Sequence, residues 1–217
     1  MANQVSSQTS KKQWCPNCKE GTYYKESDRG VFACCPEYVE TGRARTRQKK
    51  VDEMLPAKFR DMDIVTTDLF SNSKGKNLFI TGPAGTGKST LGCYLMREYA
   101  MDGKEALFVS YPEFILLMRE MHFDDRSGES PYAMARKVAE FPGWLMIDDM
   151  GAEKVTDYVR EITYNIINKR EMDKLNIIIT SNMTLDQIDE AIDSRISSRI
   201  CGMCDVLELG GKDRRVE

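Results

Sequence analysis

The chain has 217 residues, of which 41% are hydrophobic and 30% are charged, and its formal net charge is −3. This length suits one ordinary domain with a small appendage, and the hydrophobic content is sufficient for a core. The near balance of 31 basic and 34 acidic residues argues against a protein that coats DNA with its whole surface, so any nucleic-acid contact must use a local patch.

The first 13 residues are polar and lack an apolar segment, so we expect a disordered tail and not a secretory signal. No apolar run in the chain approaches the roughly 20 residues that a membrane span needs. We therefore expect a cytoplasmic protein without a membrane partner. In that reducing compartment, paired cysteines indicate metal ligands or core residues and not disulfides.

Residues 14–36 hold four of the seven cysteines, in the segment CPNCKEGTYYKESDRGVFACC. The C-x2-C pair of Cys15 and Cys18 is half of a tetrahedral thiolate zinc site. The second half is unusual, because Cys34 and Cys35 are adjacent and adjacent side chains of an extended strand point in opposite directions. A turn, which the following proline favours, would let both bind. We predict a zinc-binding module; the alternatives are three cysteines with another ligand, or no metal.

Residues 37–56 are predicted to form a basic linker or helix. The run RARTRQKK, residues 43–50, has five positive charges and no acid. Such a run suits the phosphates of single-stranded DNA, and it equally suits a solvated linker.

Residues 57–217 are predicted to form one α/β domain, in which short apolar runs alternate with helical segments. This pattern indicates a parallel sheet with helices on both faces. Few residues follow the last expected strand, so we expect no C-terminal lid. The expected strands are 77–81, 106–110, 144–148, 176–180 and 206–209, and the clearest helices are 88–101 and 155–172.

A phosphate-binding loop is predicted from GPAGTGKS, which fits G-x-x-x-x-G-K-[ST] completely and lies between a strand and a helix. Its glycines let backbone N–H groups curl around phosphate oxygens, and the helix N-terminus adds a positive dipole end. We expect Lys88 to reach the β- and γ-phosphates of ATP and the Ser89 hydroxyl to ligate Mg²⁺. The expected nucleotide-binding residues are Gly82, Pro83, Ala84, Gly85, Thr86, Gly87, Lys88, Ser89 and Thr90.

Two carboxylates, Asp148 and Asp149, end the strand in WLMIDDMG. We expect Asp148 to hold the Mg²⁺ shell together with Ser89, and Asp149 to act as the catalytic base of a slow ATPase. The alternative for Asp149 is a cap of the following segment, because aspartate is a common cap.

Polar and basic residues follow the next strand. Asn182 ends IIITSN, where its amide can bind the γ-phosphate or orient the attacking water, or can simply start a turn. Arg195 and Arg199 in DSRISSRI are four residues apart and share a helix face. They can stabilise the transferred phosphate from a neighbouring subunit, or they can belong to a solvated basic face.

Together these motifs resemble those of AAA+ ATPases, and more narrowly those of the DnaC/DnaI-type bacterial and phage helicase loaders and their IstB-like relatives. The resemblance is carried by LPAKF (55–59), GPAGTGKST, LMIDDMGAEK, IIITSN, SRISSRI and GGKDRR. It implies Asn182 as sensor 1, Arg199 as the arginine finger with Arg195 beside it, and Arg215 as a sensor-2-like arginine at the nucleotide.

The resemblance also implies a function, that of an ATP-dependent loader of the hexameric replicative DNA helicase. In such loaders the zinc module engages the helicase, while the ATPase domain binds ATP and single-stranded DNA and self-associates through ATP-bridged interfaces. The implied cofactors are ATP, Mg²⁺ and Zn²⁺. The alternatives are an IstB-like ATPase helper of a DNA transposase and a non-enzymatic adaptor, of which the adaptor is disfavoured by the intact ATPase motifs.

The segment between the second and third expected strands is a candidate DNA-binding element, because single strands favour cations with stacking rings. Its apolar residues, Leu117 among them, are equally well explained as the core stripe of a helix. The candidate contacts are Arg119, Phe123, Arg126, Arg136 and Lys137. Of the remaining cysteines, we expect Cys93 in the core, and Cys201 and Cys204 in structural positions.

Overall fold

The computed structural model describes residues 24–25, 32–33, 36–60, 68–123, 130–151 and 154–211. They fall into two compact units, residues 1–50 and 51–217. In the first unit, β1 (Tyr24–Lys25) and β2 (Phe32–Ala33) pair antiparallel, and α1 (Pro36–Met54) contains the boundary between the units. The predicted zinc ligands, the predicted tail and Arg215 lie outside the described residues.

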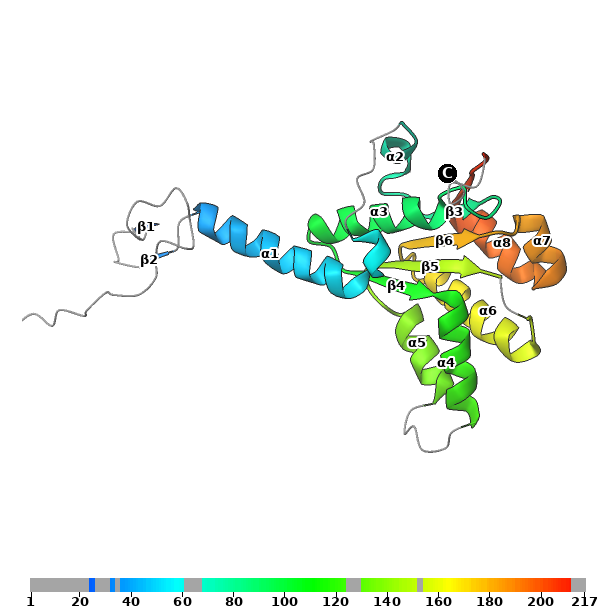
Figure 1. Ribbon diagram of the computed structural model, residues 1–217. Coiled ribbons are helices and arrows are strands. Elements are labelled where there is room, and N and C mark those ends of the chain that lie inside the picture. The colour runs from blue at the N-terminus through cyan, green and yellow to red at the C-terminus, as the bar shows by residue number, and fades with distance from the viewer. Residues whose placement is uncertain are drawn as a thin grey trace, which may run out of the picture. The chain divides into compact units, whose positions relative to one another are not determined.

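The second unit is built on a five-stranded sheet with the order β4–β5–β6–β3–β7 (Figure 1). All of its strand pairs are parallel, which confirms the predicted sheet. Every predicted strand is present, within two residues of its predicted bounds. The strands are β3 (Leu78–Thr81), β4 (Ala106–Ser110), β5 (Trp144–Met150), β6 (Ile177–Ser181) and β7 (Asp205–Glu208).

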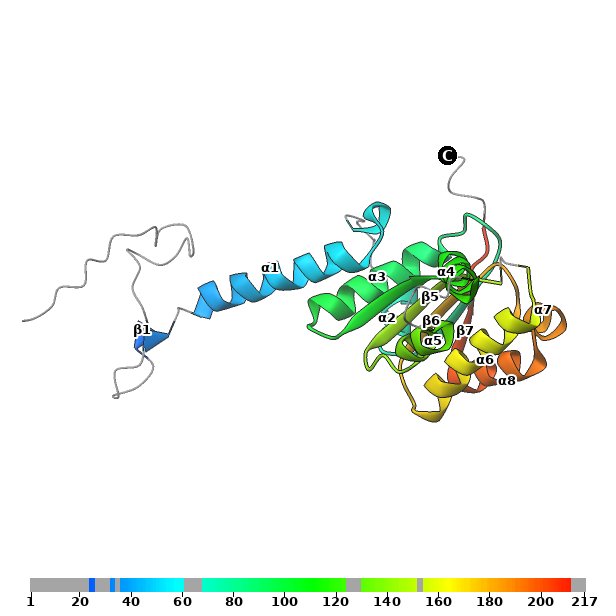
Figure 2. The ribbon, with the colours of Figure 1, turned by 90° about the horizontal axis from the view of Figure 1, so that it is seen from below.

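Helices cover both faces of the sheet, with α3 on one face and α5, α6 and α8 on the other (Figure 2). A short 3-10 helix (Ala57–Phe59) follows α1. The helices are α2 (Asp68–Ser73), α3 (Lys88–Met101), α4 (Tyr111–Phe123), α5 (Pro131–Ala139), α6 (Asp157–Met172), α7 (Leu185–Ala191) and α8 (Ser194–Met203). Within the described part of the chain, no helix has the length and apolar character to cross a membrane.

Two cores lie on opposite faces of the sheet, because successive residues of a strand point to opposite sides. One core packs against α4, α5, α6 and α8, and the strands contribute to it Phe79, Leu145, Ile147, Ile177 and Ile179. The other packs against α3 and the end of α1, and the strands contribute to it Leu78, Ile80, Trp144, Met146 and Ile178. The apolar runs of these strands therefore fit a sheet covered on both faces.

One boundary of the predicted helices is wrong, and one open alternative is decided for a single residue. The long helix begins at Asp157 and not at 155, because the Thr156 hydroxyl accepts a hydrogen bond from the Val159 N–H and caps the helix there. On α4, the alternative that places the apolar residues in a core stripe does not hold for Leu117, which is 43% exposed. Cys93 is fully buried in α3, as predicted.

Two large side chains fix the helices to the sheet. Trp144 of β5 stacks on Tyr99 of α3, with ring centroids 4.0 Å apart. Arg170 of α6 is fully buried, and burial lowers the pKa of its guanidinium to about 10. Its guanidinium donates to four backbone carbonyl oxygens. Those of Ala139, Phe141 and Gly143 lie at 3.2, 2.8 and 2.8 Å, and the carbonyl oxygen of Asn176 accepts a shorter hydrogen bond. Arg170 therefore ties α6 to the segments that lead into β5 and β6.

Candidate nucleotide site

The predicted phosphate loop runs from the end of β3 to the start of α3, as the sequence motif requires. Gly82, Gly85 and Gly87 have φ values of 139°, 77° and 95°, a region that side chains of L-residues disfavour. Lys88 is the first residue of α3. The backbone conformation of this loop therefore requires glycine at these three positions.

The start of the loop is packed against the segment that follows β7. A Cβ atom at Gly82 would lie 2.1 Å from the carbonyl oxygen of Leu209. The Leu209 N–H in turn donates to the carbonyl oxygen of Thr81 at 2.8 Å. Any side chain at Gly82 is thus excluded by contact as well as by φ.

Lys88 joins this loop to the end of β6. The residue is buried, and its Nζ donates to the carbonyl oxygens of Gly82 and Pro83 at 2.8 and 2.7 Å. It also donates to Oδ1 of Asn182 at 2.7 Å. Two residues that the sequence analysis assigned to phosphate chemistry, 94 positions apart, are therefore in direct contact.

Asn182 in turn contacts the predicted catalytic base. Its Nδ2 donates to Oδ1 of Asp149 at 3.0 Å. This amide orientation suits both neighbours, because the oxygen faces the Lys88 ammonium and the nitrogen faces a carboxylate. Lys88, Asn182 and Asp149 thus form one continuous chain of hydrogen bonds at the carboxyl ends of β3, β5 and β6.

Thr180 connects the two carboxylates and was missed by the sequence analysis. Its hydroxyl donates to Oδ1 of Asp148 at 2.7 Å and accepts from the Asp149 N–H at 2.9 Å. A signal was present in the sequence, namely a hydroxyl residue that interrupts the apolar run of IIITSN. The role of this hydroxyl becomes visible only from the pairing of β5 with β6, in which Ile147 lies opposite Ile179 and Thr180 therefore lies beside Asp148.

The residues at this edge suit ATP with Mg²⁺. The loop holds a buried lysine on a glycine-rich turn, and the oxygens of Ser89 and Asp148 are of the kind that Mg²⁺ binds. When bound, Mg²⁺ neutralises charge that develops on the phosphates. No cluster of three or more His, Cys, Asp or Glu residues in the described segments could hold a metal, and Mg²⁺ in nucleotide sites needs only one or two protein ligands.

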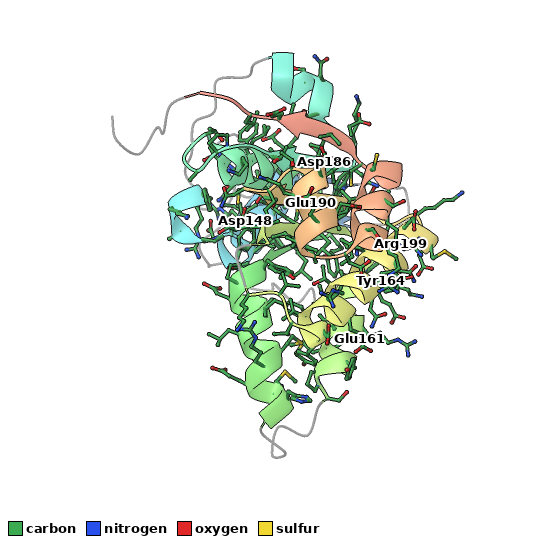
Figure 3. The ribbon with its side chains drawn as sticks, turned by 90° about the vertical axis from the view of Figure 1, so that its right-hand side faces the viewer. Asp148, Glu161, Tyr164, Asp186, Glu190 and Arg199 are labelled. Atoms are coloured by element: carbon green, nitrogen blue, oxygen red, sulfur yellow. The ribbon has the colours of Figure 1, made fainter. Side chains whose placement is uncertain are left out.

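Arg195 and Arg199 are not brought to this site within one chain. Arg199 donates to Glu171 Oε2 at 2.6 Å and to the Tyr164 hydroxyl at 3.0 Å, while Arg195 is paired with Asp193 at 2.8 Å. Figure 3 shows Arg199 and Tyr164 on the flank formed by α6 and α8, apart from Asp148. The role of these arginines at the nucleotide of a neighbouring subunit stays a prediction.

The predicted DNA contacts are described only in part. Arg119 donates to the carbonyl oxygen of Lys154 at 3.1 Å, and Arg136 forms an ion pair with Glu140 at 2.9 Å. Lys137 lies on the same helix as Arg136. The side chains of residues 123–129 lie outside the description, and with them Phe123 and Arg126. Binding of single-stranded DNA by this segment stays a prediction.

The second C-x2-C pair lies at the end of α8, where Cys201 is exposed and Cys204 is buried, both as free thiols. Burial raises the pKa of the Cys204 thiol to about 12, with a smaller contribution from Asp205. That thiol is therefore protonated at neutral pH. The buried, protonated thiol agrees with a structural role for Cys204.

Comparison with curated proteins finds relatives of two kinds. The replicative helicase loader DnaI of Bacillus subtilis (strain 168) is 25% identical over 194 residues, which cover 82% of this chain and 61% of that protein. An ATP-binding protein of insertion sequence IS1162 from Pseudomonas fluorescens is 26% identical over 159 residues. These residues cover 73% of this chain and 62% of that protein. The chain thus spans about three fifths of the length of these relatives.

Comparison with solved structures finds the same fold. A crystal structure of DnaI has a TM-score of 0.54 at 24% identity, covering 86% of this chain and 89% of that one. A structure of AMPPCP-bound DnaA from Aquifex aeolicus has a TM-score of 0.56 at 20% identity. The match covers 74% of this chain and 53% of the DnaA chain. The described sheet with its phosphate loop therefore has the fold of these two structures. The family described as IstB-like ATP binding protein matches residues 55–217, and the chain belongs to that family.

Proposed function

We propose that this chain is an ATP-dependent loader of a replicative DNA helicase. The observation that carries the proposal is the reach of the similarity to DnaI. That similarity covers 82% of this chain, whereas residues 55–217 of the family match make up only about three quarters of it. It therefore extends beyond the family match by about 15 residues, enough to reach the basic run ahead of residue 55.

The second candidate is an ATPase helper of a DNA transposase. It is supported by the family match and by the insertion-sequence relatives, of which the IS1162 protein covers 73% of this chain. Residues 55–217 alone make up about three quarters of the chain, so this match does not require any residue ahead of residue 55. The ATPase chemistry would be the same for both candidates, and the segment ahead of residue 55 favours the loader.

In the proposed mechanism, ATP binds at the loop of Lys88, with Mg²⁺ held through Ser89 and Asp148. Asp149 takes a proton from the attacking water, which Asn182 orients. The hydrogen bonds from Lys88 through Asn182 to Asp149 support this division of roles, because they connect the Asp149 carboxylate to the lysine of the phosphate loop. ATP acts as a switch for assembly and release and not as fuel for fast turnover.

The proposed zinc module predicts a separable defect. Replacing Cys15 and Cys18 by serine should remove two of four thiolate ligands, and a segment this short cannot bury a core without metal. We expect the double variant to lose binding to the hexameric helicase encoded by the same genome, measured by light scattering, while ATP binding is retained. The matched control is Cys201→Ser, which changes an exposed cysteine outside the module.

Three outcomes of that experiment separate the candidates. Loss of helicase binding in the double variant alone supports the loader and its zinc module. Helicase binding that survives in the double variant and after chelation would remove the module from this role. If the unaltered chain ignores the helicase but stimulates a transposase of the same genome, the second candidate replaces the first.

The proposed role of Arg199 in a neighbouring site predicts recovery on mixing. Lys88→Ala and Arg199→Ala should each abolish ATP hydrolysis by the assembled protein. In a random mixture, about one quarter of the interfaces combine an intact Lys88 with an intact Arg199, so steady-state hydrolysis should return to a comparable fraction. Arg195→Ala in place of Arg199→Ala tests which arginine acts. No recovery with either arginine variant would contradict a role between subunits.

A further inference from the structure

The end of β5 departs from regular pairing with β6. Ile147 pairs with Ile179, and the next recorded pair is Met150 with Ser181. Asp148 and Asp149 on β5 therefore lie opposite Thr180 alone on β6, which is the arrangement of a β-bulge. A bulge re-aims side chains and leaves the extra residue without a ladder partner.

The Thr180 side chain supplies the missing partner. Its hydroxyl has one proton and two lone pairs. The Asp149 N–H can only donate and the Asp148 carboxylate can only accept, so both hydrogen bonds have a defined direction, at 2.9 and 2.7 Å. Thr180 is fully buried, so water does not compete for its hydroxyl.

The conformation of Asp149 depends on this contact. Asp149 has φ 60°, a left-handed conformation that few residues other than glycine adopt. The hydrogen bond from its N–H to Thr180 holds the backbone there and directs the carboxylate to Asn182, whose Nδ2 lies 3.0 Å from Oδ1. The left-handed backbone is thus fixed from both sides, by Thr180 at the main chain and by Asn182 at the side chain.

We infer that Thr180 is a positioning residue for ATP hydrolysis that holds both carboxylates of the site. Its hydroxyl donates to Oδ1 of Asp148 and so fixes the orientation of the carboxylate that would hold Mg²⁺. Its lone pair fixes the backbone of Asp149, which sets the base beside Asn182. The inference rests on the ATPase activity proposed above, and it assigns to Thr180 a role that acts through the two carboxylates.

Two pairs of substitutions isolate the hydroxyl group. Thr180→Val replaces the hydroxyl by a methyl group of similar size and keeps the existing methyl group, which lies 3.5 Å from the position of a Cβ at Gly92. Thr180→Ser keeps the hydroxyl, and Thr180→Ala differs from Thr180→Ser by that hydroxyl alone. Activity that follows the hydroxyl across both pairs reports positioning, because packing changes differ between them.

We expect Thr180→Val and Thr180→Ala to lower kcat at least about tenfold, as the loss of a partner that orients a metal ligand does. The Mg²⁺ concentration for half-maximal hydrolysis should rise, while binding of a fluorescent ATP analogue without Mg²⁺ stays unchanged. Thr180→Ser should retain the wild-type kcat and Mg²⁺ dependence. Thermal unfolding of each variant shows whether the fold is kept.

The remaining outcomes contradict the inference in different ways. Wild-type kcat and Mg²⁺ dependence in Thr180→Ala would remove Thr180 from the site. An equal loss in Thr180→Ser and Thr180→Ala would show that the methyl group, and not the hydroxyl, matters. An unaltered chain that binds ATP but never hydrolyses it would contradict the proposed activity itself, and the inference with it.

Discussion

Replacing Asp149 by asparagine is expected to lower kcat for ATP hydrolysis by about 10²- to 10⁴-fold, the usual contribution of a general base. ATP affinity should stay nearly unchanged. Asparagine tolerates the left-handed backbone of this position, at φ 60°, as well as aspartate does. Its side-chain oxygen can still accept from Asn182. The substitution therefore removes the basic carboxylate and keeps the geometry.

The measurement pairs steady-state hydrolysis with equilibrium binding of a fluorescent ATP analogue. Asp148→Asn is the comparison, because loss of a Mg²⁺ ligand should weaken Mg²⁺-dependent binding as well as hydrolysis. If Asp149→Asn hydrolyses ATP at the wild-type rate, the catalytic base is another residue. Asp149 would then only shape the bulge near the end of β5.

Replacing Arg170 by methionine is expected to lower the free energy of unfolding by about 4 kcal/mol or more. The guanidinium donates to four backbone carbonyl oxygens and is fully buried. Methionine fills much of the volume but donates no hydrogen bond, so those oxygens lose a charged donor inside the protein. Urea unfolding followed by circular dichroism gives the difference.

Arg136→Met is the matched control for Arg170→Met. The Arg136 side chain is 76% exposed and forms an ion pair with Glu140 at 2.9 Å. The same substitution there should cost no more than about 1 kcal/mol, the usual value of an exposed ion pair. An equally small loss for Arg170→Met would mean that water replaces the guanidinium at the four carbonyl groups.

The sheet was predictable because its strands are apolar at nearly every position. Runs such as NIIIT need cover on both faces, and this favours a parallel sheet between two layers of helices. Strand ends were less predictable. β5 extends to Met150 because its bulge lets pairing with Ser181 resume beyond the two aspartates, and no local sequence rule marks where pairing resumes.

The contacts within the site depend on register, which the sequence does not state. The motifs identified Lys88, Asp148, Asp149 and Asn182 one by one, but their connections pass between strands that are far apart in the chain. Thr180 was missed for this reason. The exposure of Leu117 could not be predicted either, because a helical stripe does not show how wide a strip the neighbouring elements cover.

The stacking of Trp144 on Tyr99 gives the protein an internal optical probe. The chain has two tryptophans, and the other, Trp14, belongs to the first of the two units. A Trp14→Phe variant would emit from Trp144 alone, at the contact between the sheet and the helix that starts with Lys88. Changes in its fluorescence on adding ATP would report movement of that helix without an attached dye.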